Sequence, residues 1–200
     1  MERVVPIAGS NGDLQFLKNL LKQYELNPNF KDENGRTAFM RAVAKNNLEI
    51  ITYLAELNIN LRETTHLRKN VFHIACEQSK LQTLEFLRYK TAREFSKHDI
   101  DQTPLHIATF KERYDICKFL LEKKVSVNAR DKQGSTPLHI AAMTGNLPLI
   151  KLLLDHQAET KVLNVYNKTP SDTACDNENK EAYQLLTSVE IKSWIMVRFC

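Results

Sequence analysis

Glycine is scarce in this chain of 200 residues, which contains only five, with no GxGxxG pattern and no Gly-Lys-Ser/Thr sequence. Loops that hold phosphate groups need such glycines because their backbone N–H groups must approach the phosphate closely. The sequence therefore carries no signature of a nucleotide-binding enzyme.

Long hydrophobic runs and a strong charge imbalance are also missing. No segment approaches the roughly 18 apolar residues that a membrane-spanning helix needs. The formal net charge is only +4, whereas a nucleic-acid-binding face would show a cluster of basic residues. We therefore predict neither a membrane span nor a nucleic-acid partner. Hydrophobic residues make up 42% of the chain, which suits a folded protein.

The four cysteines, Cys76, Cys117, Cys175 and Cys200, form no CxxC pair and no Cys/His set with the spacing of zinc ligands. We expect Cys76 and Cys175 to be small buried hydrophobic residues in a reducing compartment. The N-terminal residues lack a basic start followed by a long apolar run, so no signal peptide is predicted. The expected location is the cytoplasm, the nucleus or both.

The strongest positive signal is a repeat with a period of 33 residues. The segment Thr136–Ala141 reads TPLHIA, and Thr103–Ala108 has the same letters. Incomplete copies begin in the same phase at Thr37, Asn70 and Thr169. In the complete copies, threonine suits the N-cap of a helix, proline its first turn, and alanine close packing against a neighbouring helix. A fixed period of this length indicates a repeat array.

These openings resemble the ankyrin repeat family, whose unit carries the pattern T-P-L-H-x-A. The resemblance implies an all-α solenoid of about six helix-turn-helix repeats joined by β-hairpin-like loops. One helix pair cannot bury its apolar face alone, so neighbouring repeats should share one core. We predict a single domain over residues 1–200, with an N-terminal cap at 1–36, repeats at 37–69, 70–102, 103–135 and 136–168, and a C-terminal cap at 169–200.

The third repeat departs from the pattern at its turn. Arg68 stands where two other turns have Gly35 and Gly134, while Asp101 and Asn167, whose types tolerate the left-handed region, occupy this place in the remaining two. A side chain at a turn position with positive φ costs roughly 1 kcal/mol. We therefore expect a remodelled loop at Thr65–Lys69, and another at Tyr89–Lys97.

Three histidines, His73, His106 and His139, recur at the repeat period and could suggest a ladder of metal sites. Packed helices lie about 8–10 Å apart, whereas a metal–nitrogen bond is only about 2 Å long. One ion would not bridge two copies. We interpret each ring as a hydrogen-bonding group for nearby backbone.

Two other arrangements could suggest catalysis. Cys76 and His73 lie three residues apart, and Asp172 and Asp176 share a helical face by spacing. Neither pair has the orienting group or partner base that nucleophilic or acid–base catalysis needs. We predict no catalytic residue, no metal site and no cofactor, and hence no enzyme.

Asn128 raises the possibility of a modification site. It resembles the asparagine that some eukaryotic ankyrin proteins present to an oxygen-dependent asparaginyl hydroxylase, and Asn29 is a weaker match. The alternative, which we favour, is a structural asparagine that bonds the loop backbone.

The resemblance also implies a binding surface, because ankyrin partners usually contact the turn tips and the exposed side of each first helix. Several residues transferred to these positions are apolar or aromatic and are flanked by lysines, which is typical of a hot spot with a charged rim. The lysines favour an acidic partner segment. Alternatively, some tips fold inward and these side chains pack. The predicted partner-binding residues are Arg36, Leu67, Lys69, Ile100, Gln102, Phe110, Lys111, Lys132, Met143, Tyr166 and Lys168.

The apolar tail Ile191–Phe199 allows two interpretations. It either seals the last repeat or forms an exposed docking strip. We favour the sealing role.

The predicted function is a non-catalytic module, expected to be a monomer, that binds another protein through its concave face as an adaptor, inhibitor or assembly factor. One alternative is the targeting portion of a larger protein or a microbial effector acting on host proteins. A hidden enzyme activity is the remaining alternative.

Overall fold

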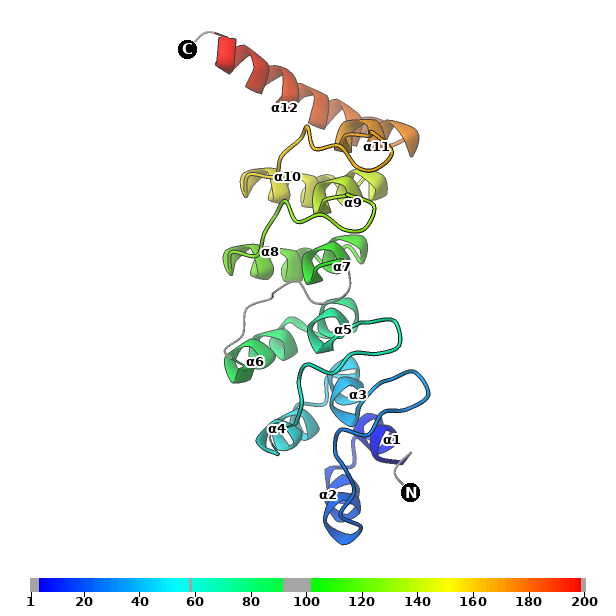
Figure 1. Ribbon diagram of the computed structural model, residues 1–200. Helices are drawn as coiled ribbons and strands as arrows, with labels where there is room; N and C mark the ends of the chain where they lie inside the picture. The colour runs from blue at the N-terminus through cyan, green and yellow to red at the C-terminus, as the bar shows by residue number, and fades with distance from the viewer. Residues whose placement is uncertain (1–3, 58, 92–101, 199–200) are drawn as a thin grey trace. The chain divides into compact units, whose positions relative to one another are not determined.

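The computed structural model describes residues 4–57, 59–91 and 102–198, and their side chains except those of residues 90, 91 and 192–198. Within these ranges it contains twelve α-helices and no strand (Figure 1). The predicted all-α class is therefore confirmed. The chain forms two compact units, Met1–Ile100 and Asp101–Cys200. The single domain expected over residues 1–200 stays a prediction.

The first unit contains three helix pairs. Helix α1 packs against α2 and α3, α3 packs against α4 and α5, and α5 packs against α6. The six helices are α1 (Val4–Asn11), α2 (Leu14–Gln23), α3 (Ala38–Lys45), α4 (Leu48–Glu56), α5 (Val71–Gln78) and α6 (Leu81–Thr91).

The second unit contains three further pairs. In Figure 1, α7, α9 and α11 are stacked in one column, with α8 and α10 in the neighbouring column. Helix α12 packs against α10 and α11. The six helices are α7 (Pro104–Phe110), α8 (Tyr114–Glu122), α9 (Pro137–Thr144), α10 (Leu147–Asp155), α11 (Pro170–Asp176) and α12 (Lys180–Arg198).

The first helices α3, α5, α7, α9 and α11 begin directly after the residues that occupy their N-cap positions. The hydroxyl of Thr169 accepts a hydrogen bond from the Asp172 N–H at 3.1 Å, and that of Thr37 accepts one from the Met40 N–H at 3.3 Å. Such N-caps contribute about 1 kcal/mol each. Proline occupies the first turn of α7, α9 and α11, where no intrahelical partner is needed for its missing N–H.

The core of the second unit lies between these columns of helices. Leu105 and Leu138 of the first helices and Leu120 of α8 are fully buried. Ala108 and Ala141 are also fully buried, and their small side chains let the first helices of successive repeats approach closely. Burial of one leucine contributes about 1.5–3 kcal/mol, which explains why the stacked pairs hold together.

Hairpin-like loops, called fingers below, precede the first helices at residues 32–36, 65–69, 131–135 and 164–168. Each is closed by a backbone hydrogen bond between its first and last residues, at 2.9–3.0 Å. Within each unit, neighbouring fingers are also linked, by the Val165 N–H to the Gln133 carbonyl at 2.8 Å and by the His66 N–H to the Asn34 carbonyl at 3.1 Å. The fingers are hairpin-like, as predicted, but they form no regular β-sheet in the described part of the chain.

The expectation of a remodelled finger at Thr65–Lys69 is wrong. Its closing hydrogen bond from Thr65 to Lys69 is the same as in the glycine-containing fingers. Arg68 adopts the left-handed conformation itself, with φ of 59°. The hydrogen bonds around the turn outweigh the cost of about 1 kcal/mol for a side chain in that conformation. The loop expected at Tyr89–Lys97 falls mostly outside the described residues.

The cysteine expectation is half right. Cys76 is buried, but Cys175, at the equivalent place in the last repeat, is exposed. The corresponding residue Ala142 of α9 is fully buried, and α9 packs against α7, α10 and α11, whereas α11 packs against α9 and α12. Burial raises the pKa of the Cys117 thiol to about 12, so this side chain stays protonated at neutral pH.

The C-terminal tail continues as helix. Helix α12 runs to Arg198, and Ile191 is 59% exposed. The side chains that would separate sealing from docking, including Trp194, lie outside the described side chains. Among the described residues, no helix is long and apolar enough to cross a membrane.

Candidate partner-binding site

The conserved spacing of histidines within this chain has a structural explanation. The N–H of Thr136 donates to Nδ1 of His139 at 3.1 Å, so the ring carries its proton on Nε2. Nε2 lies 3.0 Å from the Lys168 carbonyl oxygen and donates to it. His106 makes the same contacts with Thr103 and Ser135. These two rings therefore tie the start of a first helix to the next finger, as the backbone-bonding interpretation predicted. Nδ1 of His73 lies 3.4 Å from the Asn70 N at the start of its own helix.

His139 makes stability depend on pH. Burial disfavours the imidazolium and lowers the pKa of His139, although the hydrogen bond to the Lys168 carbonyl acts in the opposite direction. Below about pH 6.5 the unfolded chain takes up a proton that the folded ring does not. Stability from this group is therefore complete above that pH and is lost on acidification.

We expect urea unfolding at about pH 5.5 to give a lower free energy of unfolding than at about pH 7.5, with a slope of at most about 1.4 kcal/mol per pH unit from His139. A His139→Gln variant should have a shallower slope over the same range. An equal slope in both proteins would show that another group causes the dependence.

A groove of about 420 Å³ runs along the fingers of the second unit. Its walls come from the fingers 131–135 and 164–168 and from the first helices α7, α9 and α11. The Asn164 side chain shapes one finger by accepting hydrogen bonds from the N–H groups of Tyr166 and Lys168, at 2.9 and 3.1 Å. The lining residues are Gln102, Phe110, Asp131, Gln133, Ser135, Ile140, Met143, Asn164, Tyr166, Lys168, Thr173 and Asp176.

Three large hydrophobic side chains of this groove are exposed, whereas Ile140 at its base is buried. Phe110 is 53%, Met143 37% and Tyr166 69% exposed. The alternative in which the tips fold inward therefore does not apply to these residues. They come from two successive repeats, 103–135 and 136–168, so only stacking brings them to one groove.

The groove unites five of the predicted residues, namely Gln102, Phe110, Met143, Tyr166 and Lys168. Lys111 lies beside it, with Nζ 5.5 Å from the centroid of the Phe110 ring. Lys132 is exposed but does not line the groove. Asp131 and Ile140 also line the groove and were not among the predicted residues.

The other predicted residues behave differently. In the first unit, Leu67 is 76% exposed, Arg36 is half-buried, and Lys69 pairs with Glu77 at 2.6 Å. Ile100 lies outside the described residues. Lys168 pairs with Asp176 at 3.3 Å, at the place equivalent to the Lys69–Glu77 pair. Two of the lysines expected to attract an acidic partner are therefore already neutralised by acidic side chains.

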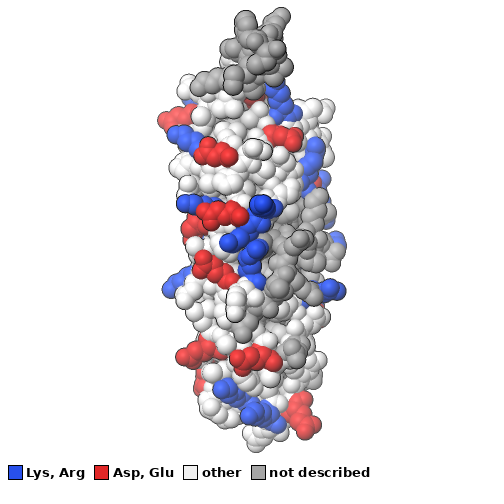
Figure 2. All heavy atoms as spheres, turned by 90° about the vertical axis from the view of Figure 1, so that its left-hand side faces the viewer, with Lys and Arg blue, Asp and Glu red and all other residues white. Residues whose placement is uncertain are grey.

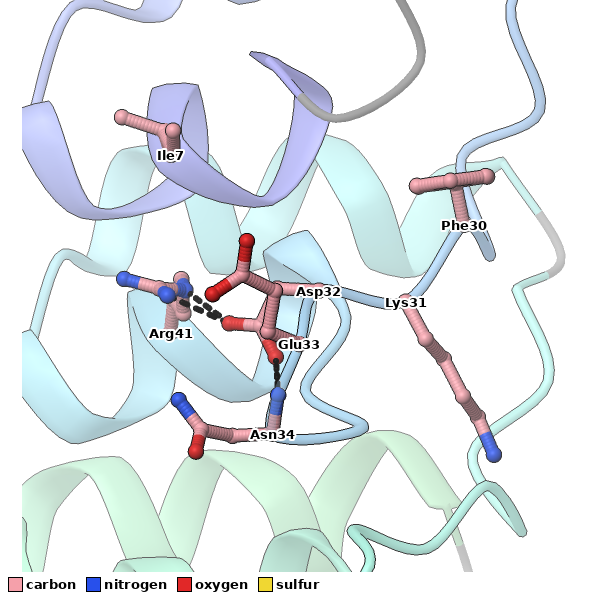
Figure 3. A pocket seen from close by; sticks show the side chains of 7 residues that line it. All are labelled: Ile7, Phe30, Lys31, Asp32, Glu33, Asn34 and Arg41. Carbon is pink, nitrogen blue, oxygen red and sulfur yellow. Dashed lines mark hydrogen bonds and ion pairs between the residues drawn. The ribbon is translucent and has the colours of Figure 1, made fainter.

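The first unit has its own pocket of about 450 Å³ beside the finger 32–36 (Figure 3). Arg41 of α3 holds the Asp32 carboxylate there, with Nε 2.6 Å from Oδ2. Figure 3 shows Lys31 pointing away from this pair, and its Nζ lies 2.6 Å from Glu63. The lining residues are Ile7, Phe30, Lys31, Asp32, Glu33, Asn34 and Arg41.

The electrostatics of Asp32 follow from these contacts. Partial burial alone would raise its pKa, but hydrogen bonds from the N–H groups of Arg36 and Asn34 and from the Arg41 side chain outweigh that effect and lower it. The carboxylate is therefore ionised at neutral pH and is already paired with the guanidinium of Arg41.

The face of the molecule in Figure 2, which includes the side of α8 and α10, carries blue and red side chains close together. Mixed charge of this kind is typical of a solvated surface.

Asn128 is tied to the loop of the next repeat. Its Oδ1 accepts a hydrogen bond from the Glu159 N–H at 2.9 Å, and its Nδ2 donates to the Glu159 carboxylate at 3.2 Å. At the equivalent place, Asn29 accepts from the Asn60 N–H at 2.9 Å. These contacts fit the structural interpretation, and hydroxylation of Asn128 stays a prediction.

No group of three or more His, Cys, Asp or Glu side chains suited to a metal ion occurs in the part of the chain that the structure describes. The predictions of no catalytic residue and no cofactor remain predictions.

The stacked helix pairs and their linked fingers define an all-α repeat solenoid, a class of protein built for interaction surfaces. The family model for ankyrin repeats, in three copies, matches residues 6–99, 61–131 and 105–194. The chain belongs to the ankyrin repeat family, as the TPLHIA segments predicted. Ankyrin repeats are protein-interaction modules, generally without enzymatic activity.

A solved structure has the same fold. It is a chain in the complex of the Bd0816 predatory endopeptidase from Bdellovibrio bacteriovorus with immunity protein Bd3460, with a TM-score of 0.80 and 24% sequence identity. The match covers 93% of this chain and 97% of that chain. At this identity the similarity shows the fold alone. No curated protein sequence matches the chain.

Proposed function

We propose that the chain is a non-catalytic interaction module whose groove in the second unit binds a segment of a partner protein. One observation carries this proposal: Phe110, Met143 and Tyr166 line the same groove and are all exposed. Clustered exposed apolar side chains mark interaction sites more often than isolated ones do. Aromatic side chains that become buried on association dominate binding energies.

The surrounding charges influence the choice of partner. Lys111 and Lys132 are exposed and favour acidic residues in the flanks of a partner segment, as the sequence suggested. The Lys168–Asp176 and Lys69–Glu77 pairs weaken that preference at the first helices. We propose that acidic residues of the partner lie near the exposed Lys111 and Lys132.

The proposed role is that of an adaptor, inhibitor or assembly factor, acting as a monomer in the cytoplasm or nucleus. Arg36, Leu67, Lys69 and Ile100 are proposed as a secondary contact surface. The similar solved chain belongs to a complex of an endopeptidase with an immunity protein, which supports a role in a two-protein complex. Since one fold serves many functions, targeting of a larger protein or action as a microbial effector remains the second candidate.

The test is the double variant Phe110→Ala/Tyr166→Ala. Proteins captured from cell extract by the wild-type chain are identified by mass spectrometry, and the affinity of the main partner is then measured. We expect at least about fivefold weaker binding, because two exposed anchors are removed. Thermal unfolding should change little, since neither side chain is buried.

A double variant Tyr114→Ala/Tyr183→Ala provides the matched control, because both tyrosines are exposed and neither lines the groove. It should bind like the wild type. Equal binding by the wild type and the Phe110/Tyr166 variant would reject the groove as the partner site.

A further inference from the structure

From the groove's charges and from an internal comparison of the two units, we infer that the groove receives an arginine side chain of the partner, held by Asp131. This inference rests on the proposed function and specifies the chemistry of the partner segment. It is carried by three observations: the environment of Asp131, the equivalent place in the first unit, and the groove walls.

Asp131 and Asp32 occupy equivalent places in their fingers. In both, Oδ1 accepts a hydrogen bond from the N–H of the last finger residue, Arg36 or Ser135, at 2.8 Å. Both fingers are also closed by a backbone bond between the same two positions. The two carboxylates are therefore presented by the same local geometry.

Asp32 and Asp131 differ in the groups that contact their second carboxylate oxygen, Oδ2. In the first unit, Oδ2 of Asp32 is held by the Arg41 guanidinium, whose Nε lies at 2.6 Å. Arg41 is the fourth residue after the helix cap Thr37, and the fourth residue after Thr136 is Ile140. Among the described residues, none forms a hydrogen bond or ion pair with Oδ2 of Asp131. The second unit thus has the acceptor of this pair without its guanidinium.

The walls of the groove suit the rest of an arginine side chain. Ile140 and Met143 offer apolar surface to the methylene stem. The exposed rings of Phe110 and Tyr166 offer faces on which a planar guanidinium stacks. Nζ of Lys111 lies 5.5 Å from the centroid of the Phe110 ring, so a partner guanidinium would have to displace it from that face.

The charges that line the groove also favour a cationic side chain of the partner. The charged residues that line the groove are Asp131, Lys168 and Asp176. Lys168 and Asp176 pair with each other at 3.3 Å, so Asp131 supplies the excess negative charge. A guanidinium binds one carboxylate through two parallel N–H···O bonds, which favours arginine over lysine.

The probe is an acetylated, amidated tripeptide of leucine, arginine and leucine, titrated into the full chain and followed by the amide NMR signals of Gly134 and Ser135. Its partner probe replaces arginine with citrulline, which has the same shape without the charge. We expect citrulline to weaken binding at least about tenfold, because the charge-assisted hydrogen bonds are lost. Equal affinities for the two peptides, or no binding of the arginine peptide, would overturn the inference.

The decisive variant is Asp131→Asn. The fold should survive, because Asn164 at the same place of the next finger accepts the equivalent hydrogen bond, from the Lys168 N–H at 3.1 Å. We expect at least about tenfold weaker binding of the arginine peptide, and no change in Asp155→Asn, an exposed aspartate at the end of α10. Retained affinity in Asp131→Asn would overturn the inference.

A second variant, Ile140→Arg, supplies the guanidinium from within the chain and copies Arg41. It should abolish binding of the arginine peptide while α9 stays folded, as judged by its amide signals. Binding undiminished in the folded variant would contradict the inference.

Capture of the natural partner separates the two proposals. If Phe110→Ala/Tyr166→Ala weakens capture and Asp131→Asn does not, the groove is the partner site and the arginine inference fails. If the double variant also captures normally, the proposed function itself fails.

Discussion

Replacement of His139 by alanine is expected to lower the free energy of unfolding of the unit Asp101–Cys200 by about 2–4 kcal/mol. His139 is 2% exposed and joins the Thr136 N–H to the Lys168 carbonyl. Alanine leaves both backbone groups without this partner and leaves a cavity where the ring was. Burial of an unsatisfied polar group costs about 1–3 kcal/mol, and the lost packing adds to it.

The measurement is urea unfolding of the full chain, with hydrogen exchange of the amides in α9 and α11 to assign the loss to this unit. Assignment is needed because repeat arrays can unfold one part at a time. The matched control is His156→Ala. That ring is half-buried and bonds only the Leu152 carbonyl of its own helix, so a change of less than about 1 kcal/mol is expected. Equal losses in the two variants would contradict the bridging role of His139.

Replacement of Gly9 by valine is expected to destabilise the first unit by about 3 kcal/mol or to detach α1 from α3. A Cβ atom on Gly9 would lie 2.3 Å from the Ala38 carbonyl oxygen and 2.8 Å from the Ala38 Cα. These are backbone atoms at the start of α3, so no side-chain rotation relieves the overlap. Valine is only slightly more favourable than glycine in a helix. The steric overlap therefore determines that the substitution is destabilising.

Valine at the neighbouring Ser10 is the control, since it introduces the same side chain into the same helix at a position that is only half-buried. We expect a loss of less than about 1 kcal/mol there. Hydrogen exchange of the α1 and α3 amides in the full chain measures both effects. Protection of α1 in Gly9→Val equal to that in the wild type would show that the two helices do not approach as closely as the structure has them.

Much of the fold could be predicted because most repeats contain residues that mark where their first helices begin. Thr103 and Thr136 cap helices, the prolines that follow fit the first turns, and Leu105 and Leu138 fill the core. Predictions from short stretches of sequence were wrong where contacts with other residues determine the structure. Arg68 keeps its turn through hydrogen bonds around the finger, and Cys175 is exposed although Cys76 at the equivalent place is buried.

The binding site was predictable only in outline. The family pattern identified finger and first-helix positions, including Phe110, Met143 and Tyr166, because these positions are fixed by the repeat period. It did not indicate which lysines are paired. The Lys168–Asp176 ion pair depends on side chains eight residues apart that meet only when the finger folds over the helix.

By itself, the sequence determined the period, the helix starts, the buried columns and the absence of nucleotide-binding motifs, because each depends on residues close together in the chain. Tertiary structure decided which of the marked residues share a groove and which charges remain unpaired. Stacking brings Phe110 together with Met143 and Tyr166 of the next repeat, and the replacement of Arg41 by Ile140 at the equivalent place leaves Asp131 for a partner to bind. These features depend on contacts between repeats, which no single stretch of sequence contains.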